Sequence, residues 1–132
     1  MPLVRFDIIE GRSDEEITRI LDASHEAMME AFGLSSRDRF QIVTEHKPSH
    51  FRVEGTDLGL VRTRNVTIVS VTTHQRPRKE KFDFNLLLCR KLQERCGIAP
   101  TDVVINFVVN AFEDWSFGEG EPHYIRGPLA QP

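Results

Sequence analysis

The chain has 132 residues, of which 39% are hydrophobic and 28% are charged, and its formal net charge at pH 7 is −3. This composition favours one soluble domain over residues 1–132, which would bury about two-thirds of its unfolded surface. The interspersed charges exclude a nucleic-acid-binding surface, and no run approaches the roughly 18 apolar residues of a membrane span. No signal peptide is recognisable, so we expect a cytoplasmic protein with neither a nucleic-acid nor a membrane partner.

The first third of the chain predicts a strand, a helix and a second strand. Apolar and charged residues alternate over residues 3–9, which is typical of a strand with one buried face. Ser13 and Glu16 form a capping-box signature, which predicts a helix that ends at Gly33. Residues 40–45 then alternate again and predict the second strand.

The same order of elements returns later in the chain. Residues 66–72 predict a strand, and a helix follows from about Arg78 to a stop at Gly97. Residues 103–109 predict the last strand. On the second helix the apolar positions are expected at Phe82, Leu86, Cys89, Leu92 and Cys96.

An offset of 64 residues relates the two halves, about 2–64 and 66–132. It superposes Gly33-Leu34-x-x-x-Asp38 on Gly97-Ile98-x-x-x-Asp102, Pro2 on Val66, and Arg12 on Arg76. Two β-α-β repeats predict an α/β (α+β) fold with a four-stranded sheet backed by two helices. The strand at 66–72 has no clearly polar face, so we expect oligomerisation to cover the second face of the sheet. A short extra strand is also expected at residues 50–53.

Pro2 directly follows Met1. Removal of Met1 would leave a secondary amine at the start of the first strand, and amino termini titrate near neutrality, with a reference pKa of about 7.7 to 8.0. A pocket can use such an amine as a base, a proton donor or an iminium-forming nucleophile. Many proteins begin with Met-Pro and never use the amine, so the dipeptide alone indicates little.

The turn His74-Gln75-Arg76-Pro77-Arg78 precedes the second helix and is rich in cationic groups. A helix amino terminus favours an anion, and an arginine fork can bind a carboxylate with two hydrogen bonds. The turn is therefore a candidate carboxylate cradle, although charged turns beside helices are commonly just solvated.

Asp38 lies between Arg37 and Arg39, and its simplest interpretation is an ion-paired surface carboxylate. Its repeat mate Asp102 suggests that an aspartate at this turn binds the backbone. The histidines have no metal-ligand spacing, and no cofactor motif is present, so we expect no metal and no cofactor. The carboxyl-terminal segment is rich in Gly and Pro but carries three aromatic residues, which are expected to pack: Trp115, Phe117 and Tyr124.

Five runs of sequence carry a family resemblance: Pro2-Leu3-Val4-Arg5-Phe6-Asp7, Glu10-Gly11-Arg12, Arg37-Asp38-Arg39-Phe40-Gln41, Leu58-Gly59 and Asp114-Trp115-Ser116-Phe117-Gly118. Together they resemble malonate semialdehyde decarboxylases of the tautomerase superfamily over nearly the whole chain. The resemblance implies a homotrimer of doubled β-α-β subunits, a small carboxylate substrate, and Pro2 as the first residue after Met1 is removed.

Carried over residue by residue, the resemblance makes Pro2, Asp38 and Arg76 the catalytic residues. The family has an arginine at the position of His74, and Arg78 would fit the family's Arg-Pro-Arg motif only after a two-residue shift. His74 and Arg78 are thus alternative partners of Arg76 in binding the substrate. The apolar pocket wall implied by the family comprises Trp115, Phe117 and Leu129, with Tyr124 as a further member.

The first functional hypothesis is a cofactor-independent decarboxylase, a carbon-carbon lyase for malonate semialdehyde or a similar 3-oxo acid. Protonated Pro2 would donate to the carbonyl oxygen, or neutral Pro2 would form an iminium. Asp38 would orient Pro2 or activate a water, which would permit a hydratase side activity. Two alternatives stay open: a tautomerase (keto-enol isomerase) for a 2-hydroxydienoate or arylpyruvate, and a catalytically inactive trimeric homologue.

Overall fold

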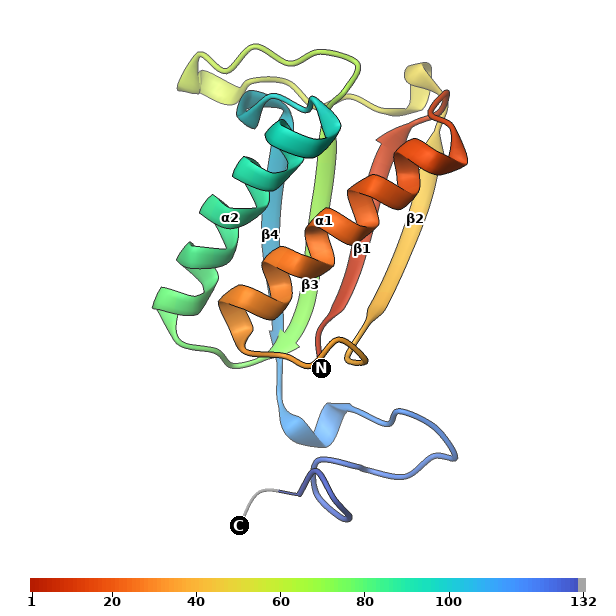
Figure 1. The fold of residues 1–132 in the computed structure, drawn as a ribbon, viewed down its shortest axis with the longest axis vertical. Helices are drawn as coiled ribbons and strands as arrows, with labels where there is room; N and C mark the ends of the chain where they lie inside the picture. Colours follow the sequence, from red (N-terminus) through yellow and green to blue (C-terminus); the bar gives the residue numbers. More distant parts are fainter. Residues whose placement is uncertain (131–132) are drawn as a thin grey trace.

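The computed structural model describes residues 1–130, so the last two residues of the expected domain, 131 and 132, lie outside the described residues. The main elements follow the chain as β1 (Leu3–Ile9), α1 (Asp14–Phe32), β2 (Phe40–His46), β3 (Thr67–His74), α2 (Arg78–Cys96) and β4 (Val103–Asn110). The sheet order is β2-β1-β3-β4, and both helices cover the same face (Figure 1). The two expected β-α-β units are therefore confirmed.

The strand directions determine which ends of the elements meet. Within each unit the two strands are parallel, whereas β1 and β3 pair antiparallel at the centre of the sheet. The starts of β1 and β2 therefore share one edge of the sheet with the ends of β3 and β4, as Figure 1 shows at its lower side. The two repeats are thus related by an approximate twofold axis through the β1–β3 pair.

The helix ends lie where local sequence predicts them. The Ser13 hydroxyl accepts a 3.1 Å hydrogen bond from the Glu16 amide, which begins α1. Gly33 and Gly97 end the two helices with φ of 66° each, a left-handed conformation that glycine adopts without steric cost. Neither helix within residues 1–130 is long and apolar enough to cross a membrane.

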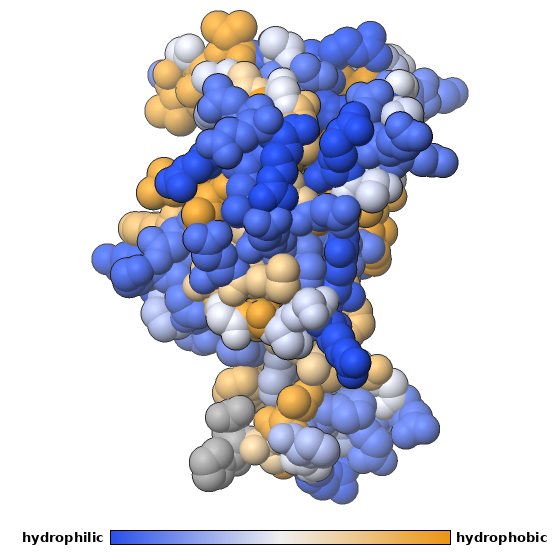
Figure 2. Space-filling view, in the orientation of Figure 1, coloured by the Kyte–Doolittle hydropathy of each residue, from blue (hydrophilic) through white to orange (hydrophobic). Residues whose placement is uncertain are grey.

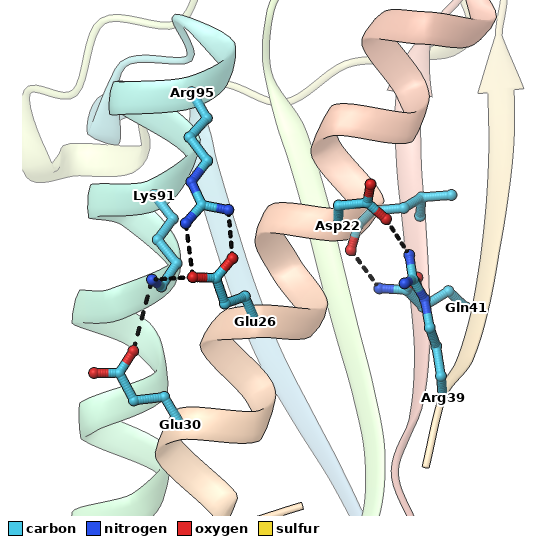
Figure 3. A network of polar contacts seen from close by, with 8 residues as sticks. Asp22, Glu26, Glu30, Arg39, Gln41, Lys91 and Arg95 are labelled. Carbon is cyan, nitrogen blue, oxygen red and sulfur yellow. Dashed lines mark hydrogen bonds and ion pairs between the residues drawn. The ribbon is translucent and has the colours of Figure 1, made fainter. Parts of the chain in front are cut away.

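The core lies between the helices and the sheet. It contains Val4, Phe6, Ile20, Ala23, Ala27, Met28, Phe32, Val69, Val71, Phe84, Leu88, Leu92 and Ile98. On the outer side of the helices, Glu26 of α1 accepts hydrogen bonds of 2.5 and 2.7 Å from Arg95 of α2, and Lys91 bridges Glu26 and Glu30 (Figure 3). Hydrogen bonding to Arg95 lowers the pKa of Glu26 to about 2. This outer surface is predominantly hydrophilic (Figure 2).

Two local predictions were wrong. Residues 50–53 form no strand, because the Pro48–His50 segment is a 3₁₀ turn in which the His50 amide donates to the Lys47 carbonyl at 2.8 Å. On α2, Phe82 and Leu86 are 58% and 69% exposed. The buried residues of α2 are Phe84, Leu88 and Leu92, of which Leu92 was expected.

The sheet face opposite the helices stays open in the single chain. Phe40 and Ile42 of β2 and Val108 of β4 are exposed large hydrophobic residues on the strands. An exposed apolar sheet of this kind is a typical association surface.

Candidate active site

One edge of the sheet brings the predicted catalytic residues together. Leu3 pairs with Phe40 of β2 and with Thr72 of β3, so the chain before Leu3 lies between the start of β2 and the end of β3. Pro2 and Arg76 are buried there, and the carboxyl-terminal segment continues from β4 past the same edge (Figure 1).

The amino terminus is held in a polar pocket. The Met1 amine donates a hydrogen bond to the Tyr124 hydroxyl and lies 3.7 Å from Asp38 Oδ2. Burial lowers the pKa of this amine below its usual 8.0, Arg76 lowers it further, and Asp38 opposes the shift. Burial also raises the pKa of Tyr124, so this hydroxyl stays protonated at neutral pH.

Asp38 faces the amino terminus and not its sequence neighbours. Arg39 instead donates to Asp22 Oδ1 at 2.8 Å and to Gln41 Oε1 at 2.7 Å, which ties it to α1 and β2 (Figure 3). Asp38 Oδ2 faces the amine, whereas Oδ1 is buried without a hydrogen-bond partner within the described residues. Asp38 is thus ion-paired as its simplest interpretation expected, but with the amino terminus, and its side chain is only 13% exposed and not at the surface.

The repeat mate Asp102 behaves differently from Asp38. Asp102 is 1% exposed and accepts hydrogen bonds from the Thr63 amide at 2.7 Å and from the Thr63 hydroxyl at 2.5 Å. The prediction that the turn aspartate binds the backbone is thus confirmed for Asp102 alone. At the equivalent position in the first repeat, the carboxylate of Asp38 faces the amino terminus instead.

This contrast predicts that replacing Asp102 lowers the free energy of unfolding much more than replacing Asp38. Asp102→Ala is expected to lower the free energy of unfolding by about 2–4 kcal/mol, because it removes a buried carboxylate that accepts two hydrogen bonds from Thr63. Asp38→Ala is expected to change it by less than about 1 kcal/mol, since the ion pair of Asp38 with the Met1 amine spans 3.7 Å and no described protein group donates to Oδ1. Urea unfolding of both variants at one protein concentration measures the difference, and equal losses would contradict a purely structural Asp102 and a functional Asp38.

Arg76 lies near enough to the amino terminus to lower the pKa of its amine. It is 8% exposed, its Nε donates to Thr73 Oγ1 at 2.9 Å, and its guanidinium lies 4.3 Å from the centre of the Phe32 ring. Glu80 Oε1 is 3.8 Å from Nη1, and burial lowers the pKa of Arg76, although an arginine keeps its charge in a protein. Arg78, on the first turn of α2, is exposed.

His74 ends β3 against an aromatic cluster. Its ring centre lies 4.6 Å from that of Phe112 and 5.5 Å from that of Tyr124. Nδ1 lies 3.0 Å from the Gln75 carbonyl, which can only accept, so Nδ1 carries a proton. Burial lowers the pKa of His74 below 6.5, and the positive Arg76 and amino terminus add to the effect. The imidazole is therefore neutral at pH 7.

The aromatic residues of the carboxyl-terminal segment form a wall centred on Phe117. Its ring centre lies 5.4 Å from Trp115, 5.3 Å from Tyr124 and 5.7 Å from Phe40. Trp115 and Phe117 also line a cavity of about 300 Å³ together with Leu3 and Phe40. Leu129 is half-buried in the same segment.

Two aromatic members of this region were not anticipated from the sequence. Phe112 packs against both His74 and Tyr124, and Phe40 stacks on Phe117 from β2. Both lie next to strand ends, where alternation of apolar and polar residues gives no information about side-chain contacts. In residues 1–130, no group of three His, Cys, Asp or Glu side chains is arranged to hold a metal ion.

Two models of the family described as tautomerase enzyme match the chain, one at residues 2–60 and the other at residues 38–118. The chain belongs to the tautomerase superfamily. Probable tautomerase YrdN of Bacillus subtilis (strain 168) is 45% identical over 129 residues, which cover 98% of this chain and 100% of the relative. This relative thus matches essentially the full sequence.

Two solved tautomerase-fold structures at similar identity are malonate semialdehyde decarboxylases. One, described with decarboxylase and hydratase activities, is 40% identical with a TM-score of 0.91, over 93% of this chain and 95% of that one. The other, inhibited by 3-bromopropiolate, is 39% identical with a TM-score of 0.92, over 98% and 99%. At 20% identity, a fused 4-OT symmetric trimer shares the fold with a TM-score of 0.74, over 90% and 94%.

Proposed function

We propose that this tautomerase-superfamily enzyme decarboxylates malonate semialdehyde or a similar 3-oxo acid. The observation that carries the proposal is the meeting of the amino terminus, Asp38 and Arg76 at one sheet edge beside the aromatic wall. The two decarboxylases at 39–40% identity support the choice of substrate.

The reactive group would be the Pro2 amine, exposed by removal of Met1. Met1 now occupies the space beside Tyr124 and Asp38, so its departure would leave that space to a substrate. Burial lowers the pKa of the Met1 amine, and we expect the same direction for the Pro2 amine, because Pro2 lies deeper. Near neutral pH both protonation states would then be populated, which suits a proton donor or an iminium-forming nucleophile.

Arg76 would hold the substrate carboxylate while the bond to the adjacent carbon breaks. The electron pair of that bond moves toward the carbonyl, where a proton from Pro2 or an iminium nitrogen receives the developing charge. Carbon dioxide leaves, and the resulting enol or enamine takes a proton at carbon. The enol also loses its hydroxyl proton to give acetaldehyde, whereas the protonated enamine is an iminium that water hydrolyses to acetaldehyde and the free Pro2 amine. The apolar wall would disfavour the localised charge of the bound carboxylate relative to the dispersed charge of the transition state.

His74 should make binding depend on pH. Its pKa is lowered below 6.5, so the ring gains charge only as the pH falls below that value, and a second cation beside Arg76 would then attract the carboxylate. We expect KM to fall as the pH is lowered from 7 to 5. His74→Arg should give a KM about fivefold lower at pH 7 and a weaker dependence of KM on pH, the remainder coming from titration of the Pro2 amine, with the exposed His50→Arg as control. A dependence of KM on pH in His74→Arg as steep as in the wild type would exclude His74 from the cradle.

A second candidate is a tautomerase that ketonises a 2-hydroxydienoate or arylpyruvate with Pro2 as base. It is favoured by the neutral His74, because Arg76 is then the fully positive side chain of the cradle without a second cation beside it. The 45% identity to a probable tautomerase also favours it. A hydratase side activity would use Asp38 to activate a water at the same site.

The first experiment is proton NMR of malonate semialdehyde with protein whose intact mass shows that Met1 has been removed. Rapid formation of acetaldehyde supports the decarboxylase. Failure of the processed protein to form it, with turnover of phenylpyruvate or 2-hydroxymuconate, would replace the proposal by the tautomerase. Inactivity toward all three would favour the catalytically inactive homologue.

We also propose that the protein is a homotrimer. The open sheet face exposes Phe40, Ile42 and Val108, and the fused 4-OT of similar fold is a trimer. Sedimentation equilibrium should give three times the chain mass of 15.2 kDa.

A further inference from the structure

A small cavity lies beside Pro2, between α1 and the start of β2. It is lined by Pro2, Ser24 and His25 of α1, and Asp38, together with Val4, Met28, Arg39, Phe40 and Gln41. Its volume of about 10 Å³ corresponds to one water molecule and is too small for any substrate.

Two polar atoms on this cavity have no hydrogen-bond partner. Within the described residues, three side chains have such a buried atom, and two of them, Ser24 Oγ and Asp38 Oδ1, belong to this cavity; the third is Asn85 Oδ1. Ser24 is 2% exposed, so bulk water does not reach its hydroxyl. Leaving a buried hydroxyl or carboxylate oxygen unpaired costs about 1–3 kcal/mol, so the two atoms require a partner.

The charged and polar neighbours of the cavity are already engaged elsewhere. Arg39 donates to Asp22 and Gln41. His25 Nε2 lies 3.1 Å from the Ser36 carbonyl and must donate to it. The remaining charged or titratable groups that interact with Asp38 are the amino terminus, Arg76 and Tyr124. Within the described residues, none of these groups donates a hydrogen bond to Asp38 Oδ1.

We propose that this cavity holds one ordered water, which accepts a hydrogen bond from the Ser24 hydroxyl and donates one to Asp38 Oδ1. Ser24 is then a positioning residue that acts through the water and Asp38. With Oδ1 anchored to α1, Oδ2 is held toward the amino terminus, where it lies 3.7 Å from the amine. The role of Asp38 in turnover rests on the proposed function, whereas the water site does not.

The direct test is a crystal structure of the processed protein at about 1.5 Å resolution. We expect an ordered water about 2.8 Å from both Ser24 Oγ and Asp38 Oδ1, and its loss or displacement in Ser24→Ala. An empty cavity, or a direct bond between the two side chains, would overturn the proposal. Because this measurement needs no substrate, it stands or fails independently of the decarboxylase activity.

Kinetics test the positioning role. Alanine is the best helix former, so Ser24→Ala should fold, which circular dichroism checks. For the substrate that the wild type turns over, we expect kcat of this variant to fall about fivefold to tenfold with KM unchanged. A loss of this size corresponds to the loss of one hydrogen bond. The matched control is Ser36→Ala, an exposed serine whose contact to His25 uses only its carbonyl. A Ser24→Ala variant with unchanged kcat, or with a change in KM alone, would contradict the positioning role.

Discussion

Pro2→Ala is expected to reduce acetaldehyde formation from malonate semialdehyde by about 10²- to 10⁴-fold, the range lost when a general acid or nucleophile is removed. Alanine leaves a primary amine that lacks the ring and rotates freely, so the proton or lone pair is no longer fixed toward the substrate. The fold should survive, because Pro2 precedes β1 and its nitrogen contributes no hydrogen bond to the sheet.

The measurement is the initial rate by proton NMR, with intact mass confirming removal of Met1 in both proteins. Pro48→Ala is the matched control, since it makes the same change in a 3₁₀ turn after β2. A wild type that retains Met1 should be as inactive as Pro2→Ala. Full turnover by Pro2→Ala would rule out the Pro2 amine as the proton donor or nucleophile of the reaction.

Arg76→Ala is expected to lower kcat/KM by about 10²-fold, the consequence of losing a charge-assisted, bidentate contact to the carboxylate. Arg78→Ala is expected to lower it by less than about threefold, because Arg78 is exposed on the first turn of α2 while Arg76 is buried beside Thr73. The two variants distinguish two alignments with the family's Arg-Pro-Arg motif. In the gapless alignment His74 and Arg76 occupy the arginine positions, and in the alignment shifted by two residues Arg76 and Arg78 occupy them.

Steady-state kinetics on both variants, with thermal unfolding as a check on the fold, measure this difference. The exposed Arg90→Ala on α2 controls for the loss of a positive charge far from the sheet edge. Equal losses in Arg76→Ala and Arg78→Ala would favour the shifted alignment and make Arg78 part of the cradle.

The fold was predictable because the information is local and occurs twice. The capping box of α1, the αL glycines and strand alternation act within a few residues, and the glycines and the alternation recur at an offset of 64. The buried side of α2 was not predictable, because two apolar stripes are offset by two residues, one through Phe82 and Leu86 and one through Phe84 and Leu88. Only packing against α1 and the sheet selects the second.

The site was predictable in part, and mostly through family resemblance. Pro2 and Arg76 carry recognisable chemistry in sequence, whereas Asp38 and Asp102 look alike until the structure shows that Thr63 binds only Asp102. The contacts of Tyr124 with the amino terminus span 123 residues, and no spacing rule reaches across that distance. Ser24 was not predicted either, because the sequence does not show which groups the hydroxyl of a serine within a helix faces.

The amino terminus and the carboxyl-terminal segment that carries Phe117 and Tyr124 lie at the same edge of the sheet, and this has a practical consequence for anyone who produces the protein. An affinity tag before Pro2 would convert the secondary amine into an amide, and a tag after residue 130 would extend the segment that carries Phe117 and Tyr124. Inactive preparations could therefore reflect the expression vector and not the enzyme. Fusions are better inserted at the opposite edge, in the 3₁₀ turn at Thr56–Leu58, where Leu58 is 76% exposed.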